Sequence, residues 1–224
     1  MVSKQPQAGG RPATADVMPM ISDERRRLAD LIDSLSPAQL DTPSLCHAWT
    51  VKQVAAHVIG PFATRRRWFL PVIVRSGFNL HRATARLAEL ISDRPAAEIT
   101  AVLRENAETP YRAPIVGFLG QLTDLQVHGQ DIRRPLGLPH ALAPDRLRLS
   151  LDFLAGRRAR GFFVPRGLMA GLRFEATDLG WSCGAGAVVR GPAEAVMLAM
   201  TGRPAALTEL DGDGLPILRH RLER

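Results

Sequence analysis

The spacing of apolar residues changes once along this chain, near Gly167, and this change limits the possible folds more than any other feature. Within residues 28–35, apolar side chains recur at i, i+3, i+4 and i+7, which is one face of an amphipathic α-helix. Within residues 172–177, apolar and polar side chains alternate, as in a strand with one buried face. The sequence therefore predicts a helical domain over about residues 20–165 and a small α+β domain over about residues 168–224.

Capping and turn residues divide the first domain into helices. We expect helices at about 22–36, from Val51 onward, and at about 79–92, 95–107, 117–134 and 144–159, with prolines punctuating the connections. Thr50 and Gln53 have the spacing of a capping box, which fixes the start of the second helix at Val51. Successive helices with short connections favour an antiparallel bundle. Residues 1–19 read as a disordered tail.

The second domain combines strands with short helices. A second strand is predicted at residues 187–191, and a helix follows at 193–201 with Gly202 in the position after its last turn. Residues 215–222 fit either a last strand or a short helix. Ser182 and Cys183 fall in a stretch rich in Trp and Gly, which we interpret as a turn.

Composition excludes some classes of function. The net charge of +7 comes almost wholly from arginine, because lysine occurs only at Lys4 and Lys52. These arginines are dispersed rather than gathered with aromatic residues, so we interpret them as solvated helix faces and expect no nucleic-acid partner. No apolar run approaches the roughly 20 residues of a membrane-spanning helix. The N-terminus lacks the apolar core of a secretory signal, so we expect a cytoplasmic protein without disulfides.

The segment 123–131 carries the most informative polar side chains. Asp124 and His128 are four residues apart and Asp131 is three beyond His128, so all three project along one side of a helix. A carboxylate and an imidazole at this spacing form half of a divalent-metal site, and His57, between apolar neighbours on the second helix, is the candidate third ligand. The spacing of Asp124 and His128 is equally typical of a hydrogen bond between the two side chains. His57 could likewise be an ordinary histidine of the core.

Three separated blocks of the sequence resemble a known family. The string Thr42-Pro-Ser-Leu-Cys-His-Ala-Trp-Thr-Val-Lys-Gln-Val-Ala-Ala-His57 is similar to a signature of the maleylpyruvate isomerase family of mycothiol-dependent enzymes, within the DinB/YfiT-like metalloenzyme superfamily. The block from Asp124 to Gly137 and the segments 171–181 and 190–203 resemble later blocks of that family, in the same order.

The resemblance implies a DinB-like four-helix bundle with a small C-terminal α+β domain. It implies a divalent metal, zinc by preference, held by His57, Asp124 and His128, although well-characterised members have glutamate where this chain has Asp124. It places Arg203 near the metal, serving the substrate or the thiol. Asp131 then either orients His128 or is a surface carboxylate paired with Arg134.

The implied activity uses mycothiol, a low-molecular-weight thiol, as cosubstrate. A metal-bound thiol loses its proton and can add to a conjugated double bond. Rotation and elimination then give cis–trans isomerisation of a small-molecule substrate, whereas retention of the adduct gives thiol transfer. A metal-dependent hydrolase of the same fold, or a non-catalytic binding protein with a decayed site, remains an alternative. We expect a monomer or a homodimer, with the C-terminal domain closing over the open end of the bundle and bringing Arg203 to the pocket.

Overall fold

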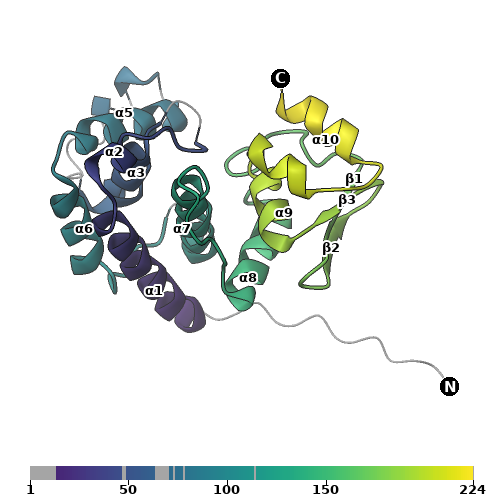
Figure 1. Ribbon diagram of the computed structural model, residues 1–224, viewed down its shortest axis with the longest axis horizontal. Helices are drawn as coiled ribbons and strands as arrows, with labels where there is room; N and C mark the ends of the chain where they lie inside the picture. The colour runs from purple at the N-terminus through teal and green to yellow at the C-terminus, as the bar shows by residue number, and fades with distance from the viewer. Residues whose placement is uncertain are drawn as a thin grey trace.

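The computed structural model describes residues 14–46, 49–63, 71–72, 74–77, 79–113 and 115–223. Its helical half is a bundle in which two helices each pack against the same pair of partners. Both α1 (Thr14–Asp33) and α3 (Val51–Ala63) pack against α6 (Ala96–Glu105) and α7 (Gly117–Arg133). The outer face of α3 is covered by α5 (Leu80–Ser92), as Figure 1 shows at the left of the molecule.

The helices largely lie where the hydrophobic period predicts them. The expected capping box at the start of α3 is formed: the Thr50 N–H donates to Gln53 Oε1 over 2.9 Å, and the Gln53 N–H donates to Thr50 Oγ1 over 3.3 Å. The first helix differs, because α1 begins at Thr14, inside the segment expected to be a tail, and residues 1–13 lie outside the described part of the chain. A short α2 (Pro37–Leu40), with its own capping box from Ser36, follows it.

A second unit follows the bundle. Helix α8 (Pro144–Ala155) packs against α7 on one side and against α9 (Ala193–Met200) on the other. Its apolar residues Leu147, Leu151 and Leu154 are buried in the same core as α9 and the strands, separate from the core formed by α1, α3 and α6. Helix α8 thus shares its core with the C-terminal unit. In the sequence, α8 precedes residue 168, where the change of apolar spacing predicts that this unit begins.

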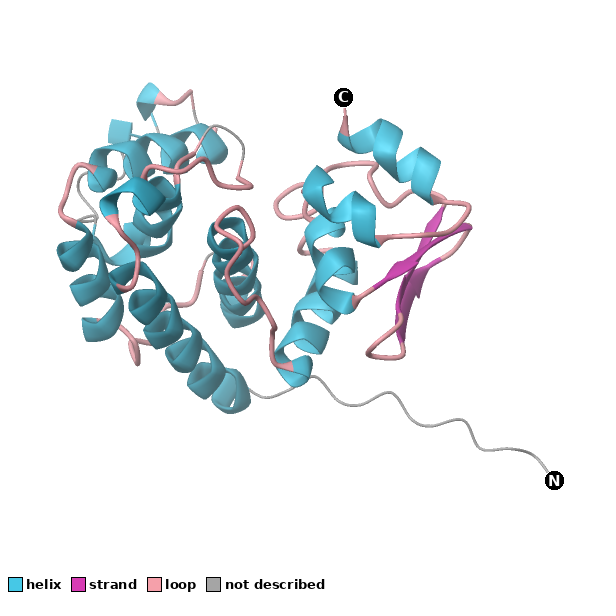
Figure 2. Cartoon of the chain, in the orientation of Figure 1, coloured by secondary structure: helices cyan, strands magenta, loops and turns pink. Residues whose placement is uncertain are grey.

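The sheet of the C-terminal unit is drawn in magenta in Figure 2. It has three strands in the order β2-β1-β3. The predicted strands are present as β1 (Leu172–Ala176) and β3 (Ala187–Gly191), which pair in parallel. The interpretation of Ser182 and Cys183 as a turn is wrong, because β2 (Trp181–Gly184) pairs antiparallel with β1. A four-residue strand is too short to give a clear period, which explains the error.

Glycine makes the return from β2 to β3 possible. Gly186 has φ +123°, and a β-carbon there would lie 2.1 Å from the Gly171 carbonyl oxygen. Only glycine fits so close an approach of two backbone segments. Beyond α9, whose C-terminus is followed by Gly202 at φ +86°, come the 3-10 helix η1 (Pro204–Glu209) and α10 (Leu215–Leu222), so the last segment is a helix rather than a strand.

Two further features of the described residues concern helix length and the cysteines. In the described part of the chain, no helix is both long and apolar enough to cross a bilayer. Cys46 and Cys183 are both free thiols, as expected from their separation in the sequence.

Candidate metal centre

Helix α7 is buried on nearly all sides, because it lies between the bundle and α8 (Figure 1). Its inward-facing residues include polar ones: the side chain of Asp131 is fully buried, His128 is 7% exposed, and Asp124 is half-buried. The three follow one another by four and three residues, so the helix aligns them along one side. A helix that buries such groups must supply partners for them.

The facing helix α3 brings His57 to this row. The rings of His57 and His128 meet edge to face, with centroids 4.9 Å apart. His128 Nε2 lies 3.5 Å from Asp124 Oδ1. One ligand atom from each of His57, Asp124 and His128 can be chosen so that all three lie within 4.8 Å of one another. The structure therefore brings together the three residues that the sequence predicts as ligands.

Asp131 connects this cluster to the C-terminal unit. His128 Nδ1 lies 2.9 Å from Asp131 Oδ2, and because an ionised carboxylate only accepts hydrogen bonds, Nδ1 carries the hydrogen. The same carboxylate accepts two bonds from Arg203, from Nε over 3.0 Å and from Nη2 over 2.7 Å. The interpretation of Asp131 as a surface partner of Arg134 is therefore wrong: Arg134 pairs instead with Glu194 and Glu209.

The loop between α2 and α3 closes the cluster from another side. The Leu45 N–H donates to the backbone carbonyl of Asp131 over 3.1 Å, which ties the loop to α7. The Trp49 ring lies 5.0 Å from the His57 ring and 6.4 Å from the His128 ring, measured between centroids. The indole thus covers both imidazoles and limits their contact with water.

Charge and burial shift the pKa values of the two histidines in opposite directions. Burial lowers the pKa of His128, but attraction to Asp124 and hydrogen bonds to Asp124 and Asp131 outweigh it and raise the pKa to about 9. Burial and the nearby positive charge of His128 lower the pKa of His57 to about 4. The pKa of Asp124 is below its usual value, because attraction to His128 outweighs the effect of burial. At neutral pH the carboxylates of Asp124 and Asp131 are therefore balanced by protonated His128 and by Arg203, while the His57 ring is neutral and free to bind a cation.

These residues fit a divalent metal. Two imidazoles and one carboxylate are a donor set that zinc uses in catalytic sites. The hydrogen bond from Nδ1 of His128 to Asp131 leaves Nε2, on the Asp124 side, as the ring atom that could bind a metal, which is the carboxylate–histidine arrangement found behind many zinc ligands. A cation there would take the place of the Nε2 proton as the partner of Asp124.

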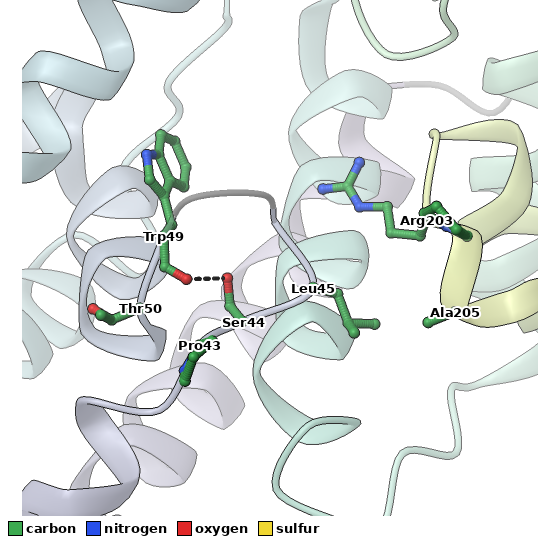
Figure 3. Close-up of a pocket in the computed structure, with 8 residues that line it drawn as sticks. Pro43, Ser44, Leu45, Trp49, Thr50, Arg203 and Ala205 are labelled. Carbon is green, nitrogen blue, oxygen red and sulfur yellow. Dashed lines mark hydrogen bonds between the residues drawn. The ribbon is translucent and has the colours of Figure 1, made fainter. Parts of the chain in front are cut away.

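Two cavities border the cluster on different sides. One, of about 750 Å³, is lined by His57 and Asp124 among mainly apolar residues of α3, α5 and α7. The other, of about 480 Å³, lies between the α2–α3 loop and the start of η1, and Trp49 and Arg203 line it. Figure 3 shows the Arg203 side chain reaching from the C-terminal unit toward the loop that carries Trp49, where the Ser44 hydroxyl donates to the Trp49 carbonyl over 2.8 Å.

The sequence interpretation missed one residue of this region altogether. Arg25 belongs to the run Arg25–Arg27, which was assigned to a solvated face, yet its side chain is 1% exposed and lines the larger cavity. The side chains of Arg26 and Arg27 are 48% and 64% exposed, so the assignment is wrong for Arg25 alone. Arg25 is four residues after buried Ile21 and three before buried Leu28, and this spacing was the available signal.

Comparisons with known proteins agree with this architecture of a helical bundle and a small α+β unit. The family model of the mycothiol maleylpyruvate isomerase N-terminal domain matches residues 21–133, just over half of the chain. The chain therefore belongs to this family. No curated protein matches it.

Two solved structures share its fold. A crystal structure of a mycothiol-dependent maleylpyruvate isomerase superimposes with a TM-score of 0.56 at 11% identity, covering 90% of this chain and 93% of that one. A histidine-to-alanine mutant of a mycothiol-dependent maleylpyruvate isomerase gives a TM-score of 0.55 at 10% identity, with the same coverage. At these identities the likeness extends to the fold and leaves the activity of this chain open.

Proposed function

We propose that this protein is a metal-dependent enzyme that uses a low-molecular-weight thiol, mycothiol by family, to isomerise a small-molecule substrate or to transfer the thiol to it. The observation that carries the proposal is the convergence of His57, Asp124 and His128 at one edge of a large cavity, in a chain of this family. A divalent ion, zinc by preference, would supply the chemistry of deprotonating a bound thiol at neutral pH.

The residues around the proposed ligands have separate tasks. Asp131 holds the Nδ1 hydrogen of His128, and this fixes the orientation in which Nε2 faces Asp124. Arg203 neutralises the Asp131 carboxylate, which would otherwise be a buried, uncompensated charge. Three of the five N–H groups of Arg203 are used by Asp131 and the Thr201 carbonyl. Arg203 also lines the smaller cavity, and its other two N–H groups can bind an anionic group of the thiol or substrate.

The protein's own thiols are poor candidates for the nucleophile. Burial, reinforced by nearby carboxylates, raises the pKa of Cys46 and of Cys183 to about 11 each. At neutral pH, such a group is almost entirely protonated and therefore weakly nucleophilic. A bound cosubstrate thiol is the better source of a thiolate, which agrees with the thiol dependence of the family.

A metal-dependent hydrolase is the second candidate, because the same three ligands suit activation of water. Turnover measured with and without added low-molecular-weight thiol separates the two functions. A thiol-dependent enzyme loses its activity when the thiol is omitted, whereas a hydrolase keeps it. We further propose a cytoplasmic location, with a monomer or homodimer as the working form.

The direct test is calorimetry of thiol binding in two buffers of different ionisation enthalpy. A thiol with a pKa of roughly 8.5 arrives mostly protonated and is held as thiolate, so binding releases a proton. We expect the heat to depend on the buffer, and the affinity to rise with pH below the pKa of the free thiol. A heat independent of the buffer would contradict thiolate binding and favour the hydrolase.

A further inference from the structure

Arg25 of α1 lies inside the bundle and has no charged partner among the residues that the structure describes. Its Nη1 group donates to three backbone carbonyls at the end of α6 and beyond it: Asn106 over 2.6 Å, Ala107 over 2.9 Å and Thr109 over 2.9 Å. Its Nη2 group is buried and, within the described part of the chain, has no hydrogen-bond partner. These bonds hold the guanidinium in place and leave one edge of it unused.

Arg25 is one of the residues that form the wall of the larger cavity. Arg25 lines that cavity together with His57 and Asp124, and its guanidinium carbon lies 4.8 Å from the centroid of the Phe62 ring. Among the described residues, no carboxylate forms an ion pair with Arg25, and burial lowers the pKa of its guanidinium to about 10, still charged at neutral pH. Buried charges in proteins are normally paired. We therefore expect an anion from outside the chain to pair with this arginine in the cavity.

The other residues that line the cavity indicate what kind of ligand carries this anion. Most of the lining is apolar, including Val58, Leu87 and Phe163, so the ligand has an apolar body. Gln121 Oε1 is a second buried polar atom on this wall without a partner in the described residues. A cavity of about 750 Å³ has room for a small organic molecule. The free Nη2 group suits a carboxylate, because it can donate a charge-assisted hydrogen bond to a carboxylate oxygen.

We infer that Arg25 is an anion-binding residue of the substrate cavity and holds a carboxylate of a small organic acid, with the remainder of that acid directed toward His57 and Asp124. This inference deepens the proposed function by naming the residue that selects the substrate, and it can be tested without thiol or turnover. The binding of the carboxylate does not depend on the metal, because Arg25 is a residue separate from the proposed ligands.

The test is calorimetric titration of the full chain with maleate, a four-carbon dicarboxylate, and with its uncharged diamide as the control. The titration is run on the protein as isolated and again after chelation, so that binding through a metal is distinguished from binding through Arg25. We expect maleate to bind in both states and the diamide to bind at least tenfold more weakly. Equal affinity for maleate and diamide, or loss of all maleate binding on chelation, would overturn the inference.

Two variants assign the binding to the residue. Arg25→Met removes the charge while keeping much of the side-chain length, and we expect it to weaken maleate binding about tenfold or more, as for loss of a charge-assisted hydrogen bond. Arg112→Met is the matched control, because Arg112 also lines the cavity but is exposed. We expect it to change the affinity less than twofold. Equal effects of the two substitutions would show a general charge effect and overturn the assignment to Arg25.

Arg25 also joins α1 to the end of α6, so Arg25→Met can fail to fold. In that case, the guanidinium ¹H–¹⁵N resonances of the wild-type protein give the answer. We expect the Arg25 signal to shift on addition of maleate and to stay fixed with the diamide. An unchanged Arg25 signal at saturating maleate would overturn the inference. Neither outcome decides whether the enzyme uses a thiol, which the two-buffer calorimetry tests separately.

Discussion

Helices α7 and α9 are both almost completely buried, but they differ in the kinds of side chain that they bury. Every buried residue of α9 is apolar, from Ala193 to Met200. Helix α7 buries Thr123, Gln126, Gln130 and Asp131 as well as His128. Both amide atoms of Gln126 lack a partner in the described part of the chain. A buried polar group without a partner lowers the free energy of unfolding by about 1–3 kcal/mol. Helix α7 therefore carries a loss of stability that α9 does not.

The difference between α7 and α9 indicates which buried helix of this fold carries a functional site. An apolar helix such as α9 needs no explanation beyond the core that it fills. A buried helix that carries a row of carboxylate and imidazole groups, connected by ordered hydrogen bonds to another unit, is explained by chemistry at that row. The following predictions test the difference, from the largest expected effect to the smallest.

The largest effect on stability is expected in α9. Leu198→Ala removes a fully buried side chain from the C-terminal core and should lower the free energy of unfolding by about 2–5 kcal/mol. Chemical denaturation measures this loss. The metal content of the folded variant should equal that of the wild type. A Leu198→Ala protein that is folded but has lost its metal would mean that α9 takes part in the site.

The next effect is expected at Asp131. Asp131→Asn keeps the size of the side chain but removes the negative charge that orients His128 and pairs with Arg203, and we expect metal affinity to fall about 10–100-fold. Competition with a fluorescent chelator measures this change. The control is Asp152→Asn, because Asp152 accepts a hydrogen bond from Trp181 away from the site. An equal loss of metal affinity in both variants would show that Asp131 has no special role in metal binding.

A smaller effect is expected when Arg203 is shortened in steps. Lysine cannot hold Asp131 with two parallel bonds and also present further N–H groups to a ligand in a fixed geometry, so Arg203→Lys should weaken the binding of carboxylate-bearing ligands by a few-fold. Arg203→Ala should weaken it further. Metal content should stay unchanged in both variants, and a titration with each ligand gives the result. Full binding by Arg203→Ala would exclude Arg203 from the ligand pocket.

The smallest effect is expected for Asp124→Glu. The family resemblance places glutamate at this position, and the ligand atoms of His57, Asp124 and His128 lie within 4.8 Å of one another. One further methylene lets the carboxylate reach farther toward the two imidazoles, so we expect the affinity for metal to be kept or to increase slightly. A marked loss, measured in the same chelator competition, would show that Asp124 is not in the position of that glutamate.

The sequence predicted the regular parts of the fold because they follow from local periodicity. The start of α3 at Val51 was predictable from Thr50 and Gln53, whose reciprocal bonds involve residues three apart. Strand β2 was not predictable in this way, because it is short and its pairing with β1 is a tertiary property. The early start of α1 at Thr14 was missed because Pro19 lies inside the helix, where a proline normally marks a helix boundary.

The candidate site was only partly predictable for a similar reason. The spacing of Asp124 and His128 gave half of the cluster, the apolar setting of His57 made it the candidate third ligand, and the family resemblance strengthened that choice. The bond between Arg203 and Asp131 spans 72 positions, and no local pattern predicts it. Arg25 could have been found, because it continues the apolar face of α1 formed by Ile21, Leu28 and Ile32. A charged residue within a buried stripe is a stronger signal than its place in a run of arginines.

The measurement that tests the central claim most directly is the metal content of purified protein, prepared without chelator and determined by elemental mass spectrometry. We predict about one divalent ion per chain in the wild type and almost none in His57→Ala or His128→Ala, because a site with three protein ligands loses most of its affinity with one imidazole. His140→Ala is the control, since His140 pairs with Glu194 away from the cluster, and it should keep the ion. An ion retained by both His57→Ala and His128→Ala, or lost equally from all three variants, would contradict the assignment of these residues as a metal centre.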